Sequence, residues 1–322
     1  MSRILKTVLL LALPASGKSE VRRYLAELSP AESADDFHLG PTVQLDDFPY
    51  VHLMRRIDDE LVRLGRGRIF FHGGDRPFRS PLDWGTLIQL VNEDYADLVA
   101  KTVRAPRSAA ALLFERIDAA SLRVGAPARL AALESSVGHA LADALEAEAR
   151  ALLSDQQAAY PATLEGYTVV IEFARGGPDG STLPLPTPLG YGYSLAQLSS
   201  AILDGAAILY VWVTPEESRR KNQARTDPND PGSILHHGVP LEVMLGDYGL
   251  DDMGWLEEHG ERPGAITVAA HGTTYHLPIA RFDNRVDKTS FLRSDRGAWR
   301  PEEVAAVRDG LRGALAKLAA AR

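Results

Sequence analysis

The 322-residue sequence contains no cysteine, which excludes disulfide bridges, zinc ribbons, iron–sulfur clusters and thiol nucleophiles together. Basic residues are fewer than acidic ones: the sequence has 35 Lys and Arg and 43 Asp and Glu, which gives a formal net charge of −8. Phosphate backbones and anionic lipids are met by basic surfaces, so we expect no nucleic-acid or membrane binding. The sequence also lacks an apolar run of the ~20 residues that span a membrane. We therefore expect a cytoplasmic protein.

Apolar runs alternate with helical patterns along much of the chain. Five runs have the composition of buried strands: Thr7–Leu13, Thr42–Leu45, Thr168–Phe173, Ala206–Val213 and Leu277–Phe282. Helical patterns lie between them at Ser19–Leu28, Leu195–Leu203 and Glu216–Thr226. This alternation predicts a doubly wound α/β domain on a five-stranded parallel sheet. Two short runs, Ile266–Ala269 and Thr273–His276, predict a hairpin ahead of the last strand.

The second and third predicted strands are separated by roughly 120 residues, too many for a crossover helix or a bare loop. Apolar residues recur at helical spacing from Leu130 to Leu152, so Pro127–Ala159 is expected to form one long helix or two. We expect 48–160 to be a helical insertion that covers or completes a site, with 1–47 and 161–322 forming the core. Pro301 is expected to open a last helix that runs to the C-terminus.

A glycine-containing turn lies between the first predicted strand and its helix. Its residues are Pro14, Ala15, Ser16, Gly17, Lys18, Ser19 and Glu20. The segment follows the pattern G-x-x-x-x-G-K-[ST], except that Ala12 stands at the first glycine. Gly17 lets the backbone approach a phosphate, Lys18 can reach β- and γ-phosphates, and the Ser19 hydroxyl can ligate Mg²⁺. The strand before and the helix after favour a phosphate-binding loop over a chance Gly-Lys-Ser turn.

Carboxylates follow the second predicted strand and end the third. Asp46 and Asp47 come at the carboxyl end of the second strand, where the ligand crevice of a parallel sheet lies. Asp46 could accept a hydroxyl proton during phosphoryl transfer, with Asp47 beside the substrate. Glu172 could hold Mg²⁺ through water, and Arg175 just beyond it could contact phosphate or substrate. Equally, these residues could terminate strands, begin turns or pair with each other.

Two arginine-rich segments are candidates for contacts with anions. Thr214–Arg225 is a basic helix on which Lys221 and Arg225 share a face and Arg219 points elsewhere. It could equally be a solvated surface helix. The segment 68–79 mixes aromatic residues, glycines and arginines, among them Arg76, which would suit a planar or anionic acceptor. Taken singly, its residues also fit core aromatics with surface arginines.

With these motifs, the chain resembles the P-loop kinases, in particular the nucleoside and nucleotide kinase group. The resemblance covers the strands and their loops and excludes the 48–160 insertion. The Asp-Asp-Phe run is similar to that of uridine and nicotinamide riboside kinases, which implies that Asp46 is the base. The basic helix resembles their lid helix, which implies that Arg219 and Arg225 meet the transferring phosphoryl group.

The resemblance implies a P-loop NTPase fold and an ATP- and Mg²⁺-dependent kinase of a small acceptor: a nucleoside, nucleotide or phosphosugar. Two alternatives stay open at this point. One is a zeta-toxin-like kinase of a sugar nucleotide, and the other is a regulatory nucleotide-binding module without kinase activity. The oligomeric state is left open.

Overall fold

The computed structural model describes residues 4–225 and 238–322, except for the side chain of Arg225. Its centre is a six-stranded sheet in the order β2-β3-β1-β4-β6-β5. The strands are β1 Thr7–Leu11, β2 Thr42–Asp46, β3 Thr168–Phe173, β4 Ala206–Trp212, β5 Ala265–Ala270 and β6 Thr273–Asp283. Pairing is parallel from β2 through β6, and only β5 runs antiparallel to its neighbour. The five predicted parallel strands are confirmed, whereas the sheet as a whole is mixed.

The end of the sheet differs from the prediction. The segments 273–276 and 277–282 form one continuous strand, β6, which pairs with β5 near its start and with β4 further along. His271 and Gly272, both with positive φ, make the tight turn between β5 and β6. Because no turn residue interrupts the chain between His276 and Leu277, the hairpin includes the last strand itself.

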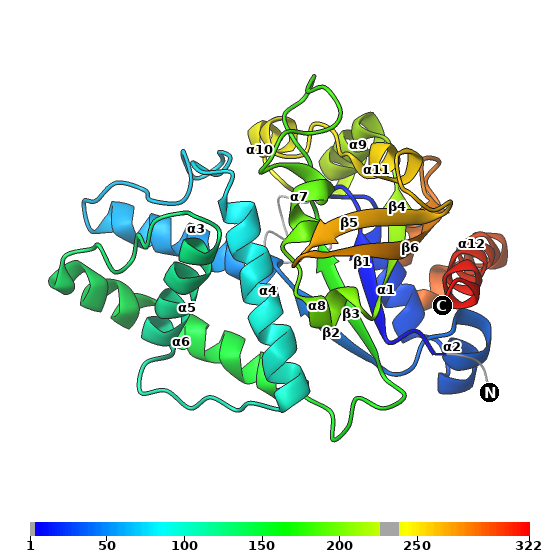
Figure 1. The fold of residues 1–322 in the computed structure, drawn as a ribbon, viewed down its shortest axis with the longest axis horizontal. Helices are drawn as coiled ribbons and strands as arrows, with labels where there is room; N and C mark the ends of the chain where they lie inside the picture. The colour runs from blue at the N-terminus through cyan, green and yellow to red at the C-terminus, as the bar shows by residue number, and fades with distance from the viewer. Residues whose placement is uncertain (1–3, 226–237) are drawn as a thin grey trace.

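Helices cover both faces of the sheet (Figure 1). Val8 and Leu10 of β1 point to one face, where they pack with α1 (Lys18–Ala26), α2 (Pro30–Phe37) and α12 (Pro301–Ala320). Leu9 and Leu11 point to the other face, as the period of two in a strand requires. There they pack with α4 (Asp83–Ala100), α7 (Gly190–Ala196), α8 (Ser200–Leu203) and α11 (Met253–Glu258).

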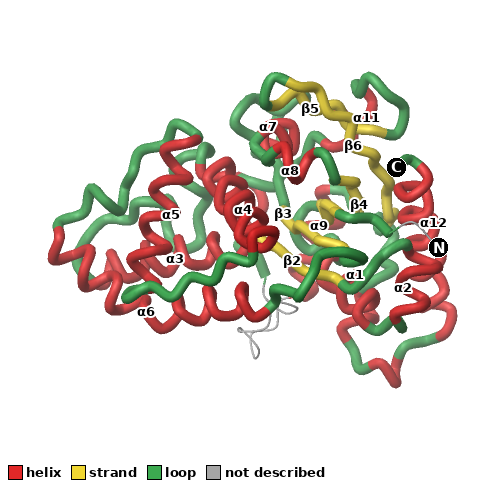
Figure 2. Tube along the Cα trace, turned by 60° about the horizontal axis from the view of Figure 1, so that its bottom comes forward, coloured by secondary structure: helices red, strands yellow, loops and turns green. Residues whose placement is uncertain are grey.

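Residues 48–160 form a helical lobe beside the sheet, seen from two directions in Figures 1 and 2. It consists of α3 (Phe48–Arg63), α4, α5 (Ala109–Arg123) and α6 (Ser135–Ala158), which share a hydrophobic core of their own. The helix α4 contributes to both cores, because Leu87 and Leu90 face the lobe while Ile88 and Val91 face the sheet. The lobe is thereby packed directly against the carboxyl-terminal side of β2.

Two predicted helices have different bounds. The helix expected at Pro127–Ala159 begins only at Ser135, because the backbone N–H groups of Leu130 and Ala131 donate to the Asp118 carboxylate and hold that segment as a loop. The helix expected at Leu195–Leu203 is split into α7 and α8 at a turn before Ser199, the residue that precedes α8. Periodicity encodes neither these bonds nor the one at the split, where the Ser199 N–H donates to Asn92 Oδ1 at 2.8 Å.

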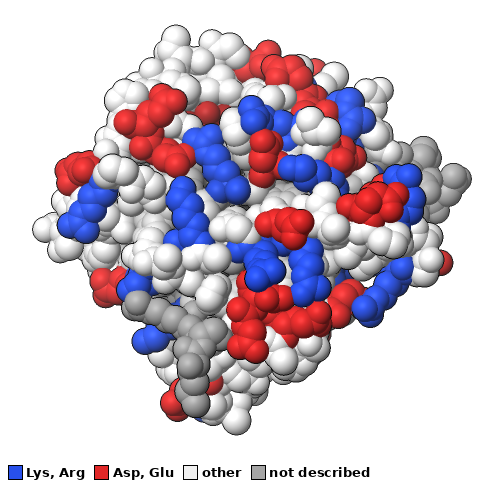
Figure 3. Space-filling view, turned by 90° about the vertical axis from the view of Figure 1, so that its right-hand side faces the viewer, with Lys and Arg blue, Asp and Glu red and all other residues white. Residues whose placement is uncertain are grey.

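The remaining helices are α9 (Pro215–Arg225), α10 (Leu241–Gly246) and the short η1 (Ser290–Arg293) and η2 (Arg296–Ala298). Within the described part of the chain, no helix is long and apolar enough to cross a membrane. On the face that carries α2 and α12, acidic and basic side chains lie side by side (Figure 3), among them the pair Arg308–Asp36 at 2.6 Å.

Candidate functional site

The Gly-Lys-Ser turn is held from two sides. Gly17 has φ 105° and caps the N-terminus of α1, and a Cβ there would lie 2.4 Å from Thr289 Oγ1, so only glycine fits. Asn284 Nδ2 donates to the Ser16 carbonyl at 2.7 Å, and Ser218 Oγ of α9 donates to the Pro14 carbonyl at 2.7 Å. The turn is therefore fixed between α9 and the loop after β6.

The alanine at the predicted first-glycine position is accommodated without strain. Positive φ values in this turn fall at Ala15 (55°) and Gly17, and Ala12 has none. Ala12 is fully buried against the α1–α12 side of the sheet, and its carbonyl accepts a hydrogen bond from Lys18 Nζ at 3.3 Å. A methyl group at this position is thus compatible with the loop.

Three carboxylates gather where β2 and β3 end. Asp46 and Glu172 are register partners on these two strands, and Asp47 follows directly. Lys18 Nζ lies 3.9 Å from Glu172 Oε1. Burial, followed by the negative charges of Glu172 and Asp47, raises the pKa of Asp46 to about 7. A carboxyl group with such a pKa can accept a proton near neutral pH.

Arg22 is a member of this cluster that the sequence analysis missed. Its Nη1 lies 3.0 Å from Glu172 Oε2 and 3.9 Å from Asp46 Oδ2. Arg22 stands one helical turn after Lys18 on α1, so the i,i+4 spacing is the signal that could have found it. It brings a second positive charge to the carboxylates of the two strands.

Arg175 forms an ion pair with a carboxylate, which is the alternative that the sequence left open beside a contact with phosphate or substrate. Its side chain is 1% exposed, and Nη1 donates to Asp47 Oδ2 at 2.6 Å. Nε donates to Ser194 Oγ at 3.0 Å, and Nη2 donates to the Trp84 carbonyl at 3.2 Å. Arg175 thus holds the Asp47 carboxylate in its orientation. It also links the segment after β3 to the first turn of α4.

A cavity of about 520 Å³ opens in front of these groups. The turn residues 14–20 line one part of it, together with Asp46, Asp47 and Glu172. The insertion lines the other part through Val51, His52 and Arg55 of α3 and through a set of rings. The rings of the insertion are Phe48, Phe71, Phe78 and Trp84, and Phe173 of β3 and Tyr248 add two rings from outside the insertion. This volume lies within the range of about 300–1,000 Å³ that small-molecule sites occupy.

A buried carboxylate holds one wall of the cavity in shape. Asp58 of α3 is fully buried and accepts hydrogen bonds from the N–H groups of Ile69, Phe70 and Phe71, at 2.7, 3.1 and 2.8 Å. These bonds fix the segment that presents the Phe71 ring to the cavity.

We expect Asp58→Ala to lower the free energy of unfolding by about 1–3 kcal/mol, because it leaves buried N–H groups without an acceptor. Chemical denaturation would measure the change. Asp59→Ala is the matched control, since Asp59 is the next residue, its side chain is about half exposed, and it pairs only at the surface with Arg68. Equal destabilisation by both variants would contradict this role of Asp58.

Of the remaining predicted site residues, Arg76 and Arg219 lie outside the cavity lining. Arg76 pairs with Glu242 at 2.7 Å on the surface, more than half exposed. Arg219 pairs with Asp179 at 3.4 Å and Glu216 at 3.5 Å. Glu20 lines the cavity, but its carboxylate pairs with Arg293 at 2.8 Å. Arg225 ends α9 with its side chain outside the described atoms, and the predicted lid segment continues into 226–237, which are not described.

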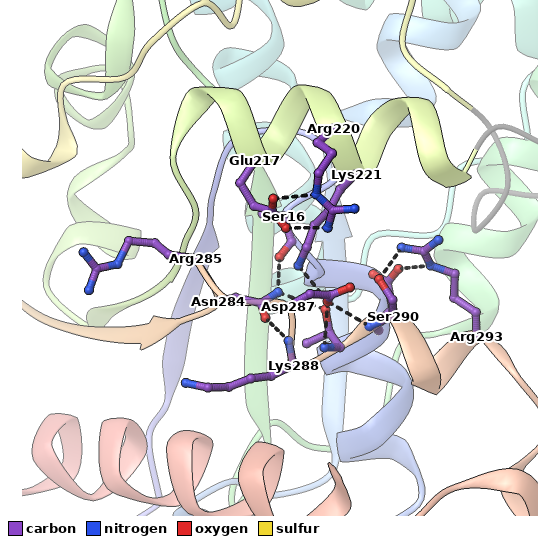
Figure 4. A network of polar contacts seen from close by, with 12 residues as sticks. Ser16, Glu217, Arg220, Lys221, Asn284, Arg285, Asp287, Lys288, Ser290 and Arg293 are labelled. Carbon is purple, nitrogen blue, oxygen red and sulfur yellow. Dashed lines mark hydrogen bonds and ion pairs between the residues drawn. The ribbon is translucent and has the colours of Figure 1, made fainter.

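The helix α9 is not the solvated surface helix that the sequence left open. Its Lys221 is 1% exposed, and its Nζ lies 2.9 Å from Asp287 Oδ1 in the loop after β6. Figure 4 shows this pair beside Ser16 and Asn284, whereas Arg220 on the outer face pairs with Glu217 at 2.7 Å. Hydrogen bonds from Lys221 and Ser290 keep the pKa of Asp287 below its usual value, although burial opposes this. The inner face of α9 therefore ties the phosphate-loop candidate to β6.

The residues present fit a phosphate group with magnesium. The Ser16 hydroxyl is buried at the cavity wall with no hydrogen-bond partner in the described structure. Ser19 and Glu172 both line the cavity and could share a Mg²⁺ ion with phosphate oxygens and water. Residues 4–225 and 238–322 contain no cluster of three or more His, Asp or Glu arranged as a self-sufficient metal site. Such a Mg²⁺ site would accordingly need the phosphate oxygens of a ligand.

Comparison with known proteins adds no relative. No family model, no curated protein and no solved structure matches the chain. Any function must therefore be argued from the site itself.

Proposed function

We propose that this protein is a P-loop phosphotransferase that uses ATP and Mg²⁺ to phosphorylate a hydroxyl group of a small molecule. The observation that carries the proposal is the single cavity that holds three things: the turn with Lys18, the carboxylates Asp46 and Glu172, and a ring-lined compartment from the insertion. A strand–turn–helix with Gly-Lys-Ser is suited to phosphate, and the ring-lined compartment is suited to a second, organic ligand.

In this proposal, each residue of the site has its own role in binding or proton transfer. Backbone N–H groups of residues 15–18 and the N-terminus of α1 bind phosphate oxygens, and Lys18 moves from the Ala12 carbonyl to the β- and γ-phosphates. Bound Mg²⁺, held by Ser19 and through water by Glu172, would supply positive charge to the phosphate oxygens. Asp46 accepts the proton of the acceptor hydroxyl while the oxygen of that hydroxyl bonds to the γ-phosphorus of ATP. The bond from the γ-phosphorus to the oxygen that bridges the β- and γ-phosphates breaks, and ADP leaves.

The ordered insertion favours a kinase over a regulatory module. Polar groups of α3, among them His52 and Arg55, face the same cavity as the turn. A module that only binds nucleotide has no need of such a compartment opposite the γ-phosphate position. The walls of the compartment also exclude water from the reacting groups. A kinase needs this exclusion to avoid hydrolysis of ATP.

Lys18→Ala is expected to weaken binding of ATP·Mg²⁺ by about 1–3 kcal/mol, because a charge-assisted contact to phosphate is lost. Isothermal titration calorimetry of wild type and variant measures the difference. Lys317→Ala on α12 is the control, since this lysine is exposed and far from the cavity lining. Identical ATP affinities for wild type and Lys18→Ala would refute the phosphate-loop assignment.

A further inference from the structure

The half of the cavity that belongs to the insertion is walled by aromatic rings. Phe71 and Phe78 stack at 4.3 Å between centroids, and Trp84 meets Phe78 edge-on at 4.8 Å. Tyr248 lies edge-on to Trp84 at 5.5 Å. The negative faces of such rings attract cations as well as apolar groups.

A carboxylate that pairs with no cation of the described residues stands among these rings. Asp247 is 7% exposed and lines the cavity. Within residues 4–225 and 238–322, Arg55 is the one cation whose charge acts on it. Burial raises the pKa of Asp247 to about 7. The site therefore carries an acceptor group whose charge the described residues leave poorly compensated.

Arg55 is the cation whose charge acts on Asp247, and its own contacts hold its guanidinium elsewhere. The Arg55 guanidinium lies over the Phe71 ring at 4.0 Å, and Nη1 donates to the Gly74 carbonyl at 2.7 Å. Its charge acts on Asp247 from a distance and lowers the pKa less than burial raises it. Arg55 is thus committed to the wall of the compartment.

The compartment is poor in cations for a phosphorylated ligand. Of the described lysines and arginines that line the cavity, Lys18 and Arg22 belong to the phosphate-loop end, and only Arg55 belongs to the ring-lined end, where His52 pairs with Glu148 at 3.0 Å. Arg76 and Arg175 lie outside the lining. Proteins hold phosphate groups with several charge-assisted donors, which this end does not provide.

We propose that the phosphoryl acceptor is an amine-bearing alcohol without a phosphate group, and that Asp247 is the residue that selects its amine. The amine donates to the Asp247 carboxylate among the faces of Trp84 and Tyr248, while the hydroxyl points to Asp46. This inference rests on the proposed function for the role of the hydroxyl. Recognition of the amine can be tested without any phosphoryl transfer.

The test measures binding to the intact protein by fluorescence and calorimetry with matched probes. Glucosamine is compared with glucose, and phenylethanolamine with phenylethanol, so that each pair differs by its amine. The phosphate ester of glucosamine is the third arm. We expect the amines to bind at least about tenfold more tightly than their partners, as a hydrogen bond to a charged group allows. The phosphate ester is expected to bind more weakly than glucosamine.

Asp247→Asn is expected to remove the preference for the amines while leaving binding of the amine-free probes and of ATP unchanged. Asp75→Asn is the control, because Asp75 is an exposed carboxylate on the neighbouring loop outside the cavity lining. An unchanged thermal unfolding temperature would show that Asp247→Asn folds. The proposal is overturned if the variant keeps the amine preference, if the phosphate ester binds best, or if neither amine binds at millimolar concentration.

Failure of the kinase proposal has a different signature. If wild type does not bind ATP, or binds it independently of Lys18, the proposed function fails, whatever the amine probes do. If ATP binds through Lys18 and the amine probes do not bind, only the acceptor inference fails. The two measurements share no ligand.

Discussion

Asp46→Asn is expected to lower turnover by about 10²–10⁴ while the affinity for ATP stays nearly unchanged. The variant keeps the shape of the side chain and its hydrogen bond from the Phe48 N–H, which is 2.8 Å in the wild type. It removes the capacity to accept the hydroxyl proton, together with the negative charge that lies 3.9 Å from Arg22. The raised pKa of Asp46, about 7, suits this role because the group stays able to take up a proton near neutral pH.

The measurement is steady-state ADP release together with calorimetric ATP binding. Asp47→Asn is the informative comparison, because Asp47 stands next to Asp46 and its carboxylate is held by Arg175 at 2.6 Å. If Asp47→Asn abolishes turnover at unchanged stability and Asp46→Asn does not, the base has been assigned to the wrong aspartate. If both variants keep full turnover, neither carboxylate is the base.

Arg175→Ala is expected to lower the free energy of unfolding by about 3–5 kcal/mol, because it leaves the buried Asp47 carboxylate without its partner. The same change removes the donors to Ser194 and to the Trp84 carbonyl, and the guanidinium that lies 4.8 Å from the Trp84 ring. Loss of this one side chain would therefore loosen both the carboxylate cluster and the ring-lined wall.

Urea denaturation measures the effect, and the double variant Arg175→Met with Asp47→Leu separates its causes. With both charges replaced by apolar groups, most of the stability should return, since no unpaired carboxylate is left buried. Arg76→Ala is the control, expected within about 0.5 kcal/mol of wild type for an exposed ion pair. Equal stabilities of wild type and Arg175→Ala would show that Asp47 does not need this partner.

The strand–turn–helix around Lys18 and the strand-end carboxylates were accessible from sequence because they depend on local patterns. A buried parallel strand is a short apolar run, and the sharp turn after it needs a residue such as Gly17 that tolerates φ 105°. Asp46 is the last residue of β2 and Glu172 the last but one of β3, so the edge where parallel strands end brings them together. The five parallel strands were predictable for the same reason.

Residue partners, by contrast, were decided by the tertiary structure. Asp47 and Arg175 are 128 residues apart in sequence, and neither neighbourhood indicates that Arg175 turns away from the cavity to hold Asp47. Arg76 and Arg219 belong to arginine-rich segments whose composition does not reveal which guanidinium faces the site and which pairs at the surface.

The sequence by itself determined the alternation of strands and helices, the phosphate-loop candidate and the carboxylates beside it. These follow from backbone periodicity and from the conformational freedom of single residues, which act over a few positions. Only the tertiary structure decided that rings of the insertion line the same cavity as Lys18, and that Asp247 stands among them with no ion pair to any other described residue. Burial and charge compensation depend on which distant segments pack together, and no local pattern carries that information.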